Sequence, residues 1–324
     1  MKKIRFLVLL FVLYSCNDNA ENKKVVVTNA DSMKPLTETS LVVLGTIQDA
    51  GSPQIGCSRD CCKDLFLHPD KERRVVSLGL VAPLDHKTFI FEATPDFTQQ
   101  AKALKNYAGF SNTEIPTGIF VTHAHIGHYT GLMYLGKEAM NADSMPVYAM
   151  PRMKTFLEQN GPWSQLVKNK NIVVQEMKDQ QEIELTNNLK VIPFTVPHRD
   201  EFSETVGYTM IGPNKKVLFI PDIDKWGKWA TNIIDEVAKV DYAFIDGTFY
   251  DEAEINNRDI STIPHPFIIE SMYLFKDLPA AEKKKIYFIH FNHTNPVINK
   301  KSWQAELVLK NGFNIASINM VIKL

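Results

Sequence analysis

The segment Thr122-His123-Ala124-His125-Ile126-Gly127-His128-Tyr129-Thr130-Gly131-Leu132 directly follows the apolar run Gly118-Ile119-Phe120-Val121. A short run rich in apolar and β-branched residues is typical of a buried strand. At an extended strand end, two residues separated by one point to the same side, so His123 and His125 can reach one metal ion. His128 follows three residues later, where the chain turns into a helix, and points at a neighbouring position. The segment therefore predicts a metal site at the end of a strand.

Three further strand-like runs lead into residues that can bind a metal. The run Leu189 to Val196 leads to His198, Lys216 to Ile220 leads to Asp222, and Ile286 to Ile289 leads to His290. In an α/β sheet the loops at the strand ends converge on one edge, where side chains distant in sequence can meet around one ion. We therefore expect these residues to join the histidines of the first segment.

The surrounding sequence alternates strand-like and helical patterns. The expected strands are 41–44, 75–81, 88–91, 118–121, 189–196, 216–220, 242–245 and 286–289, and the expected helices are about 96–107, 129–140, 152–160, 230–239, 266–276 and 297–311. No Pro/Gly/Ser-rich linker and no repeat divides this region, so we predict one α/β domain over residues 40–324.

The composition is that of a folded protein with a local binding site. The 324 residues are 44% hydrophobic and 23% charged, which excludes a disordered or fibrous chain. The formal net charge of −1 provides no overall field for a nucleic-acid backbone, so we expect no nucleic-acid partner. A small-molecule substrate is the expected partner, and the oligomeric state is left open.

The amino terminus has the pattern of an export signal. Lys2, Lys3 and Arg5 precede a nine-residue apolar run, Phe6 to Tyr14, which has the length of a signal core and is too short to span a membrane. The following Cys16 completes a segment that resembles the bacterial lipoprotein box, with a plain secretory signal as the alternative. Residues 1–16 are therefore predicted to be a lipoprotein signal peptide with lipidation at Cys16, and the polar residues 17–39 to be a tether. This predicts an exported protein, lipid-anchored to a bacterial membrane in the periplasm or at the cell surface.

The order of these motifs resembles that of the metallo-β-lactamase superfamily. The His-x-His-x-Gly-His segment, His198, Asp222 and a last histidine after a strand follow one another as they do in that family. The resemblance implies an αββα sandwich with one or two metal ions, usually zinc, at one edge. It assigns His123, His125 and His198 to the first ion, and His128, Asp222 and the last histidine to the second, with Asp222 able to bridge both.

The sequence departs from the family motif at Gly127. The family has an aspartate at this position, and that aspartate binds the second ion. Without this carboxylate we expect the second ion to bind more weakly or to be of another kind. Two histidines and one carboxylate remain, and this set also suits iron in the Fe(II) state.

A narrower resemblance is to the coenzyme PQQ biosynthesis protein B family. It is carried by Leu44-Gly45-Thr46, Ser52-Pro53-Gln54 with Cys57, Ala93-Thr94-Pro95-Asp96, Asp246-Gly247-Thr248-Phe249-Tyr250, and Phe288-Ile289-His290-Phe291-Asn292. That family is typically cytoplasmic and its first histidine motif is eroded, whereas this chain has an export signal and retains His123 and His125. The phosphonate-pathway cyclic phosphodiesterases are a second similar family, with a cysteine cluster near the start.

Cys57, Cys61 and Cys62 lie close together in one expected loop. Both similar families use cysteines there for a structural zinc, which would need a fourth donor; His68 is the nearest candidate in the sequence. A disulfide with one thiol left over is an alternative in an oxidising compartment, and free buried thiols are another.

Four further residues are candidates near the metal site. Asp246 is expected to accept the free N–H of a ligand histidine, or alternatively to cap a turn. Asp96 is expected either to play the same part or to cap a helix. His265, between two prolines, is expected to contact substrate or transfer a proton, or to be a solvated loop residue. His290 is the preferred last ligand, with His293 as the alternative.

These assignments predict metal-assisted hydrolysis. A metal-bound hydroxide would attack a small ester, lactone or phosphodiester, and Asp222 would orient that hydroxide and take its proton. One alternative is an iron-dependent oxygenase similar to the coenzyme PQQ family. Another is a lipoprotein that only binds a ligand.

Overall fold

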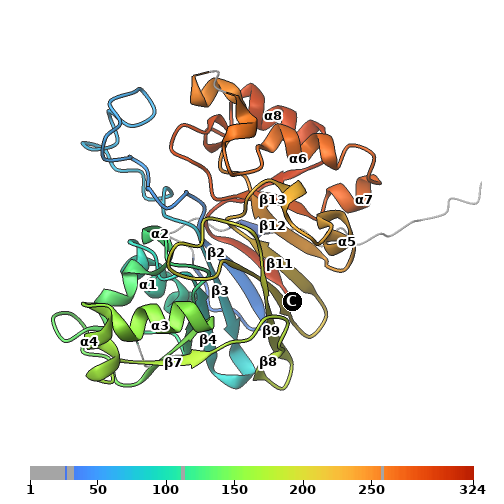
Figure 1. Cartoon of the computed structure of the whole chain (residues 1–324). Helices are drawn as coiled ribbons and strands as arrows, with labels where there is room; N and C mark the ends of the chain where they lie inside the picture. The colour runs from blue at the N-terminus through green and yellow to red at the C-terminus, as the bar shows by residue number, and fades with distance from the viewer. Residues whose placement is uncertain (1–25, 28–32, 111–113, 257–258) are drawn as a thin grey trace, which may run out of the picture.

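The computed structural model describes residues 26–27, 33–110, 114–256 and 259–324. Two β-sheets face each other, and helices cover the outer face of each sheet (Figure 1). This arrangement confirms the predicted αββα sandwich.

Each sheet contains both parallel and antiparallel neighbours. The first has eight strands in the order β1 (Val26–Val27), β15 (Met320–Lys323), β2 (Ser40–Gly45), β3 (Ser77–Ala82), β4 (Lys87–Phe91), β5 (Gly118–Phe120), β6 (Met145–Ala149) and β7 (Ile172–Glu176). The second has seven in the order β14 (Asn314–Ile315), β13 (Ile286–Ile289), β12 (Tyr242–Asp246), β11 (Lys216–Ile220), β10 (Val206–Ile211), β9 (Leu189–Thr195) and β8 (Ile183–Thr186).

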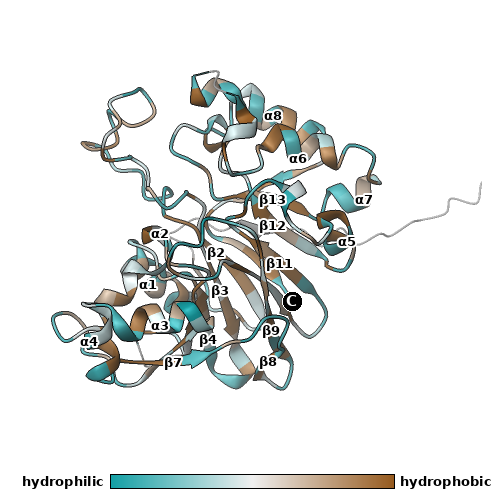
Figure 2. Ribbon diagram, viewed as in Figure 1, coloured by the Kyte–Doolittle hydropathy of each residue, from teal (hydrophilic) through white to brown (hydrophobic). Residues whose placement is uncertain are grey.

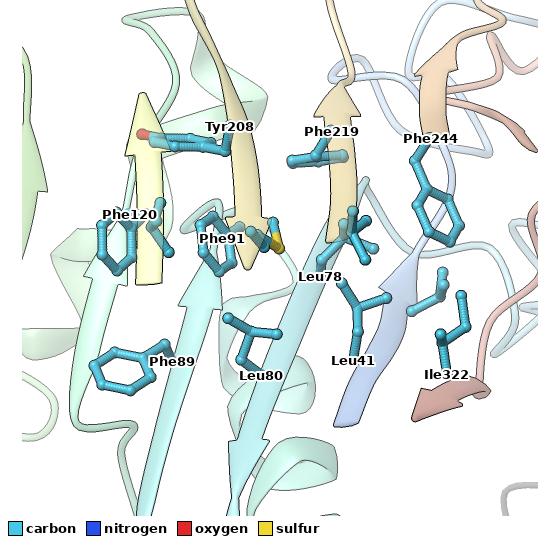
Figure 3. Packing of buried hydrophobic residues seen from close by; sticks show 14 of the residues in the cluster. Leu41, Leu78, Leu80, Phe89, Phe91, Phe120, Tyr208, Phe219, Phe244 and Ile322 are labelled. Carbon is cyan, nitrogen blue, oxygen red and sulfur yellow. The ribbon is translucent and has the colours of Figure 1, made fainter. Parts of the chain in front are cut away.

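The central strands are buried on both faces because their side chains alternate between two cores. In β2, Leu41 and Val43 face the second sheet, whereas Val42 and Leu44 face the helices. Figure 3 shows the core between the sheets, where Leu78, Leu80, Phe89, Phe91 and Phe120 face Tyr208, Phe219 and Phe244. These strands are predominantly apolar along their length (Figure 2). An uninterrupted apolar run is therefore expected here in place of strict alternation.

Two groups of helices close the outer faces (Figure 1). The first sheet is covered by helices that include α1 (Phe97–Ala108), α3 (Pro151–Gln159) and α4 (Trp163–Lys168), with α2 (Ile126–Tyr129) at its edge. The second is covered by helices that include α5 (Ile233–Ala238), α6 (Ile268–Leu274) and α8 (Trp303–Lys310), with the short α7 (Ala280–Lys283) nearby.

The carboxyl ends of several strands meet at one edge of the sandwich, which we call the rim. Strands β4, β5 and β6 are parallel in the first sheet, and β11, β12 and β13 are parallel in the second. The loops that follow parallel strands emerge on the same side. This topology brings the predicted metal-binding residues of both sheets together.

Part of the predicted tether belongs to the folded domain. Val26–Val27 pair with β15, and the Leu36 amide donates to the Tyr107 carbonyl at 2.7 Å. Met33 packs against the helix-side core of the first sheet. Residues 26–27 and 33–39 of the predicted tether therefore belong to the folded domain, and its other residues lie outside the described ranges. The predicted signal peptide and Cys16 lie outside the described residues, and within the described ranges no helix is long and apolar enough to cross a membrane.

The expected strands and helices are present with shifted ends, and several elements are additional. The expected helix at 129–140 is instead α2 followed by a 3-10 turn over Thr130–Leu135. The expected helix at 297–311 begins at Trp303, because the Ser302 hydroxyl caps it by accepting from the Ala305 amide. Strands β1, β6, β7, β8, β10, β14 and β15 and helices α4 and α7 were not expected.

Candidate metal centre

The rim collects histidines and carboxylates from both sheets. His123 and His125 follow β5, and His128 lies in α2. From the second sheet, Asp222 follows β11 and His290 follows β13. His198, after β9, completes the group, so all of the strand-end residues expected to meet do so.

One cluster is made of His123, His125, His198 and Asp222, whose candidate ligand atoms all lie within 4.8 Å of one another. Asp222 Oδ2 is 3.4 Å from His123 Nε2 and 3.2 Å from His198 Nε2. The same oxygen is 4.0 Å from His125 Nδ1. Three imidazoles and one carboxylate around a common centre are a donor set typical of zinc.

A second cluster lies beside it. His128, His290 and Asp49 each offer an atom within 4.8 Å of the others. His128 Nε2 is 3.9 Å from Asp222 Oδ2, so the two clusters adjoin at Asp222. Asp49 was not expected from the sequence, because it lies in a loop after β2 and no neighbouring residue marks it as a ligand.

The outward-facing ring nitrogens lie next to polar side chains. Glu92 Oε2 lies 3.5 Å from His128 Nδ1, and Asp224 Oδ1 lies 3.3 Å from His198 Nδ1. Hydroxyl groups contact the other two, Thr122 Oγ1 to His123 Nδ1 and Thr248 Oγ1 to His290 Nδ1, both at 2.8 Å. Partners of this kind orient a ligand histidine and select its tautomer. Sequence reasoning missed these four residues, although an acid directly after a buried strand, as at Glu92, is a usable signal.

The inward-facing atoms fit a cation. The Nε2 atoms of His128, His198 and His290 are buried and have no hydrogen-bond partner among the described residues. A buried polar atom left without a partner costs about 1–3 kcal/mol. An ion in the second cluster would satisfy His128 and His290, and an ion in the first would satisfy His198. The residues present therefore fit a metal at the rim.

The pKa values of most of these residues also favour metal binding. Burial holds the pKa of His123 and His290 well below the usual value, which keeps them in the neutral form that binds metals. Burial would raise the pKa of Asp222, but the neighbouring charges of His265 and His198 bring it well below its usual value. In the metal-free protein His128 differs, because Glu92 outweighs the effect of burial and raises its pKa to about 9.

His265 lies at the rim, as expected of a residue that contacts substrate or transfers a proton. Its Nδ1 is 3.2 Å from Asp222 Oδ1 and 3.0 Å from Asp246 Oδ2. Burial disfavours its charged form, yet these two carboxylates raise the pKa of His265 well above the usual value. The solvated-loop alternative is wrong, because the ring is largely buried between two acids.

Asp246 combines parts of both expectations. One oxygen accepts from the Thr248 hydroxyl at 2.6 Å and from the Thr248 amide at 2.8 Å, which is a turn cap. Because Thr248 also contacts His290, Asp246 acts on that histidine through a hydroxyl group and contacts His265 directly.

Asp96 is not part of the rim. Its carboxylate accepts from the Val75 amide at 2.8 Å, ahead of β3, and its side chain makes no capping bond to α1. Asp96 occupies the N-cap position of α1, as one alternative predicted, but through its main chain; the predicted contact with a ligand histidine is wrong. The carboxylate instead ties the loop before β3 to the start of α1.

The last histidine of the chain, His293, belongs to the cysteine loop. His293 lies with Cys57, Cys61 and Cys62, all four offering ligand atoms within 4.8 Å, and not with the rim. His290 reaches the rim because it ends β13, whereas the turn after Phe291 directs His293 to the cysteine loop. His293 thus fills the fourth position for which His68, an exposed residue, was the candidate.

The three cysteines are free thiols in this structure, so the disulfide alternative is wrong for it. The Sγ atoms of Cys57 and Cys61 are 3.7 Å apart, far beyond a disulfide bond of about 2.05 Å. Burial and the neighbouring thiols raise the pKa of Cys61 to about 12, so this thiol does not ionise readily without a cation. Three sulfur atoms and one imidazole are a complete donor set for a structural zinc.

Comparison with known proteins places this geometry in a family. Residues 87–291 match the model of the β-lactamase superfamily domain. Coenzyme PQQ synthesis protein B of Methylorubrum extorquens is 22% identical over 310 residues, which cover 88% of this chain and 99% of that protein.

Two solved structures share the fold. The Zn²⁺-bound PqqB from Methylobacterium extorquens has a TM-score of 0.72 at 21% identity and covers 88% of this chain and all of its own. A diphosphatase of the PhnP family has a TM-score of 0.60 at 21% identity, covering 88% of this chain and 96% of its own. The matched domain contains both rim clusters except Asp49, and the chain belongs to the β-lactamase superfamily with the metallo-β-lactamase fold.

Proposed function

We propose that this protein is a metal-dependent hydrolase that cleaves a small ester, lactone or phosphodiester. The observation that carries the proposal is the cluster of His123, His125, His198 and Asp222, with ligand atoms within 4.8 Å of one another at the meeting point of the two sheets. Zinc bound to such a set lowers the pKa of its water to about 7 and polarises a substrate carbonyl or phosphoryl oxygen.

The chain's own residues would divide the remaining work. Asp222 is 2% exposed and surrounded by imidazoles, so it is held ionised and in one orientation as a hydrogen-bond acceptor beside the metal position. His265 Nδ1 contacts both Asp222 and Asp246, and these two acids support a role for its protonated imidazole as a proton donor to the leaving group.

Residues at the mouth of the site would contact the substrate. Arg199 and Glu201 both approach His125 Nε2, at 3.4 Å and 3.5 Å, from the segment after β9. Exposed Ile126 and Phe202 add apolar surface beside them, at 62% and 61% exposure. A cation, an acid and two apolar side chains suit a small substrate with one charged or polar end.

The test is hydrolysis by the zinc-loaded full chain. We expect turnover of at least one of bis(p-nitrophenyl) phosphate, p-nitrophenyl acetate and a homoserine lactone, with loss of that activity in His198→Ala. His68→Ala, which alters an exposed histidine outside the rim clusters, serves as the matched control and keeps full activity. Zinc-loaded protein that cleaves no diester, ester or lactone, or a fully active His198→Ala variant, would refute the proposal.

A second candidate is an iron-dependent oxygenase. His128 and His290 share their position with a carboxylate, and two imidazoles with one carboxylate also suit Fe(II). The similarity to coenzyme PQQ synthesis protein B over 88% of the chain supports this reading. Metal analysis after anaerobic purification, together with oxygen uptake, separates the two candidates. Iron with oxygen consumption favours the oxygenase, whereas zinc with no oxygen consumption favours the hydrolase.

We further propose that the four-residue group at Cys57 and His293 holds a structural zinc and that Cys16 carries a lipid anchor. The supporting features are the complete donor set at the cysteine loop and the signal-like residues 1–16. Membrane fractionation tests the lipid anchor. If Cys16 carries it, Cys16→Ser releases the protein from the membrane into the soluble exported fraction.

A further inference from the structure

We infer that Asp49 is a ligand of the metal ion held by His128 and His290, and that it replaces the carboxylate that position 127 lacks. The inference rests on the proposed metal-dependent function and concerns its second ion. On this inference Gly127 is not simply the loss of a ligand, as the sequence suggested, because the ligand comes from another loop.

Two buried imidazoles already point into this position. His128 and His290 are both 0% exposed, and their Nε2 atoms have no hydrogen-bond partner among the described residues. The Asp49 carboxylate lies within 4.8 Å of a nitrogen of each. One Asp49 oxygen accepts from the Gln48 side-chain amide, which leaves the other available to an ion.

Backbone hydrogen bonds hold Asp49 beside His290. The Gln48 amide donates to the Phe291 carbonyl at 2.8 Å, and the Phe291 amide donates to the Thr46 carbonyl at 2.8 Å. Ile47 therefore pairs with the residue directly after His290. A turn follows, closed by the Gly51 amide donating to Gln48 at 2.9 Å, with Gly51 at a φ of +77°. The position of Asp49 is thus set by main-chain contacts on the same strand end that carries the ligand.

Gly127 is the residue that makes room for this carboxylate. A Cβ at position 127 would lie 2.1 Å from the Asp49 Cβ and 2.3 Å from the Asp49 Cα. No side chain at 127 fits unless the backbone at residue 49 moves. The Asp49 side chain therefore starts from nearly the same point in space as a side chain at 127 would, so one carboxylate takes the place of the other.

Charge also favours the exchange. With Asp49 and Asp222, the second position has two carboxylates and two imidazoles around it. Two negative charges balance one divalent cation, and the hard oxygen donor expected to be missing is supplied from another loop.

The test measures metal binding directly. Protein is stripped with a chelator and titrated with Zn²⁺ by calorimetry, and the bound metal is counted per chain. We expect three sites in the unaltered chain, two at the rim and one at the cysteines. In Asp49→Asn we expect the affinity of one rim site for Zn²⁺ to fall by at least roughly 10–100-fold. Loss of a residue that only orients a ligand already has an effect of that size. Asp85→Asn, an exposed acid distant from the rim, is the matched control and leaves all three sites unchanged.

A second variant separates ligation from folding. Gly127→Ala removes no donor atom, yet its methyl group must displace Asp49, so we expect it to weaken the same site. Gly227→Ala, whose methyl group meets nothing within 4 Å, is the matched control and retains zinc binding. The melting temperature of metal-free Asp49→Asn should equal that of the unaltered chain, whereas its rise on adding Zn²⁺ should be smaller. A purely structural role would instead lower the metal-free value.

The outcomes are distinguishable from failure of the proposed function. If the unaltered chain binds no zinc at the rim, the proposed function fails and this inference fails with it. If the rim binds one or two ions and Asp49→Asn binds as many with unchanged affinity, the inference alone is overturned. Unchanged zinc binding in Gly127→Ala would overturn the claim that Gly127 makes room for Asp49.

Discussion

At the scale of single residues, Glu92 illustrates how residues around the rim orient the histidines that face the metal position. It directly follows β4, is 0% exposed, and both carboxylate oxygens have no hydrogen-bond partner among the described residues. Its φ of +79° lies in the left-handed region, which costs a residue other than glycine about 1–3 kcal/mol. Strain and burial of an acid at one residue are tolerated where they serve the site, and here the acid faces His128 Nδ1 at 3.5 Å.

Replacing this acid should weaken metal binding without removing a ligand. We predict that Glu92→Gln lowers the affinity for the ion at His128 by roughly 10–100-fold, because the uncharged amide loses the electrostatic contact of the carboxylate with His128 Nδ1. Calorimetric titration of the stripped protein with Zn²⁺ measures the change. Glu72→Gln, an exposed acid, is the control, and equal affinity in the two variants would contradict this role.

Glu254 offers a test of pH dependence away from the rim. Burial raises the pKa of Glu254 to about 7, against the hydrogen bonds it accepts from the Tyr250 amide and the Thr294 hydroxyl. An acid with a raised folded-state pKa binds more protons when folded, so its contribution is fully present below the unfolded pKa and is lost as the pH rises toward 7.

We therefore predict that Glu254→Gln changes stability only at higher pH. The amide keeps the shape and cannot ionise, so the variant should gain roughly 2 kcal/mol over the unaltered chain at pH 8, and little at pH 4.5. Urea unfolding of the metal-free protein at both values is the measurement. A difference that does not grow with pH would exclude ionisation of Glu254 as the cause.

At the scale of elements, the close approach of β2 and β3 positions the loop that carries Asp49. Gly45 ends β2 at an irregularity in its pairing with β3, and a Cβ there would lie 1.9 Å from the Val75 carbonyl oxygen. The Thr46 and Ile47 amides both donate to the Arg74 carbonyl at 2.9 Å. The strand end is therefore closed against its neighbour by main-chain contacts that only glycine permits.

Gly45→Ala should consequently be destabilising. Its methyl group meets backbone and not a flexible side chain, so we expect a loss of about 2–3 kcal/mol, in the upper range for overpacked interiors. Thermal unfolding compared with Gly227→Ala measures it. A variant as stable as that control would show that β2 and β3 can separate at little cost.

At the scale of the whole molecule, the rim joins two sheets whose facing sides form an apolar core. His123, His125 and His128 come from the first sheet, and His198, Asp222 and His290 from the second. An ion bound at the rim would therefore link the sheets. Because the unfolded chain has no such assembled site, metal binding adds to the stability of the folded state.

We predict a large thermal effect of metal removal. Zn²⁺ at about 1,000 times its dissociation constant adds about 4 kcal/mol per site, which for a chain of this length corresponds to roughly 6 °C per site. Differential scanning of chelator-treated and Zn²⁺-loaded protein measures the shift. His198→Ala should lose the part of the shift that comes from the ion of the first cluster. A shift of the same size in that variant would show that this ion does not contribute to the stability.

The sequence alone determined the fold class and most of the rim. Alternating apolar runs and helical periods are local patterns, and a strand end such as Val121 or Ile220 directs the next residues to one sheet edge whatever the distant chain does. His123, Asp222 and His290 could therefore be assigned from these local patterns. Elements such as β6, which contains Pro146, could not, since their pairing overrides a weak local preference.

Only the tertiary structure decided which side chains share an ion. His290 and His293 are three residues apart, yet the turn between them sends one to the rim and the other to the cysteines. Asp49 and Gly127 are far apart in sequence, and their exchange is visible only as a Cβ position 2.1 Å from another. Local patterns report the direction in which a strand points, whereas a metal site depends on where separate loops meet, and that is fixed by the packing of the two sheets.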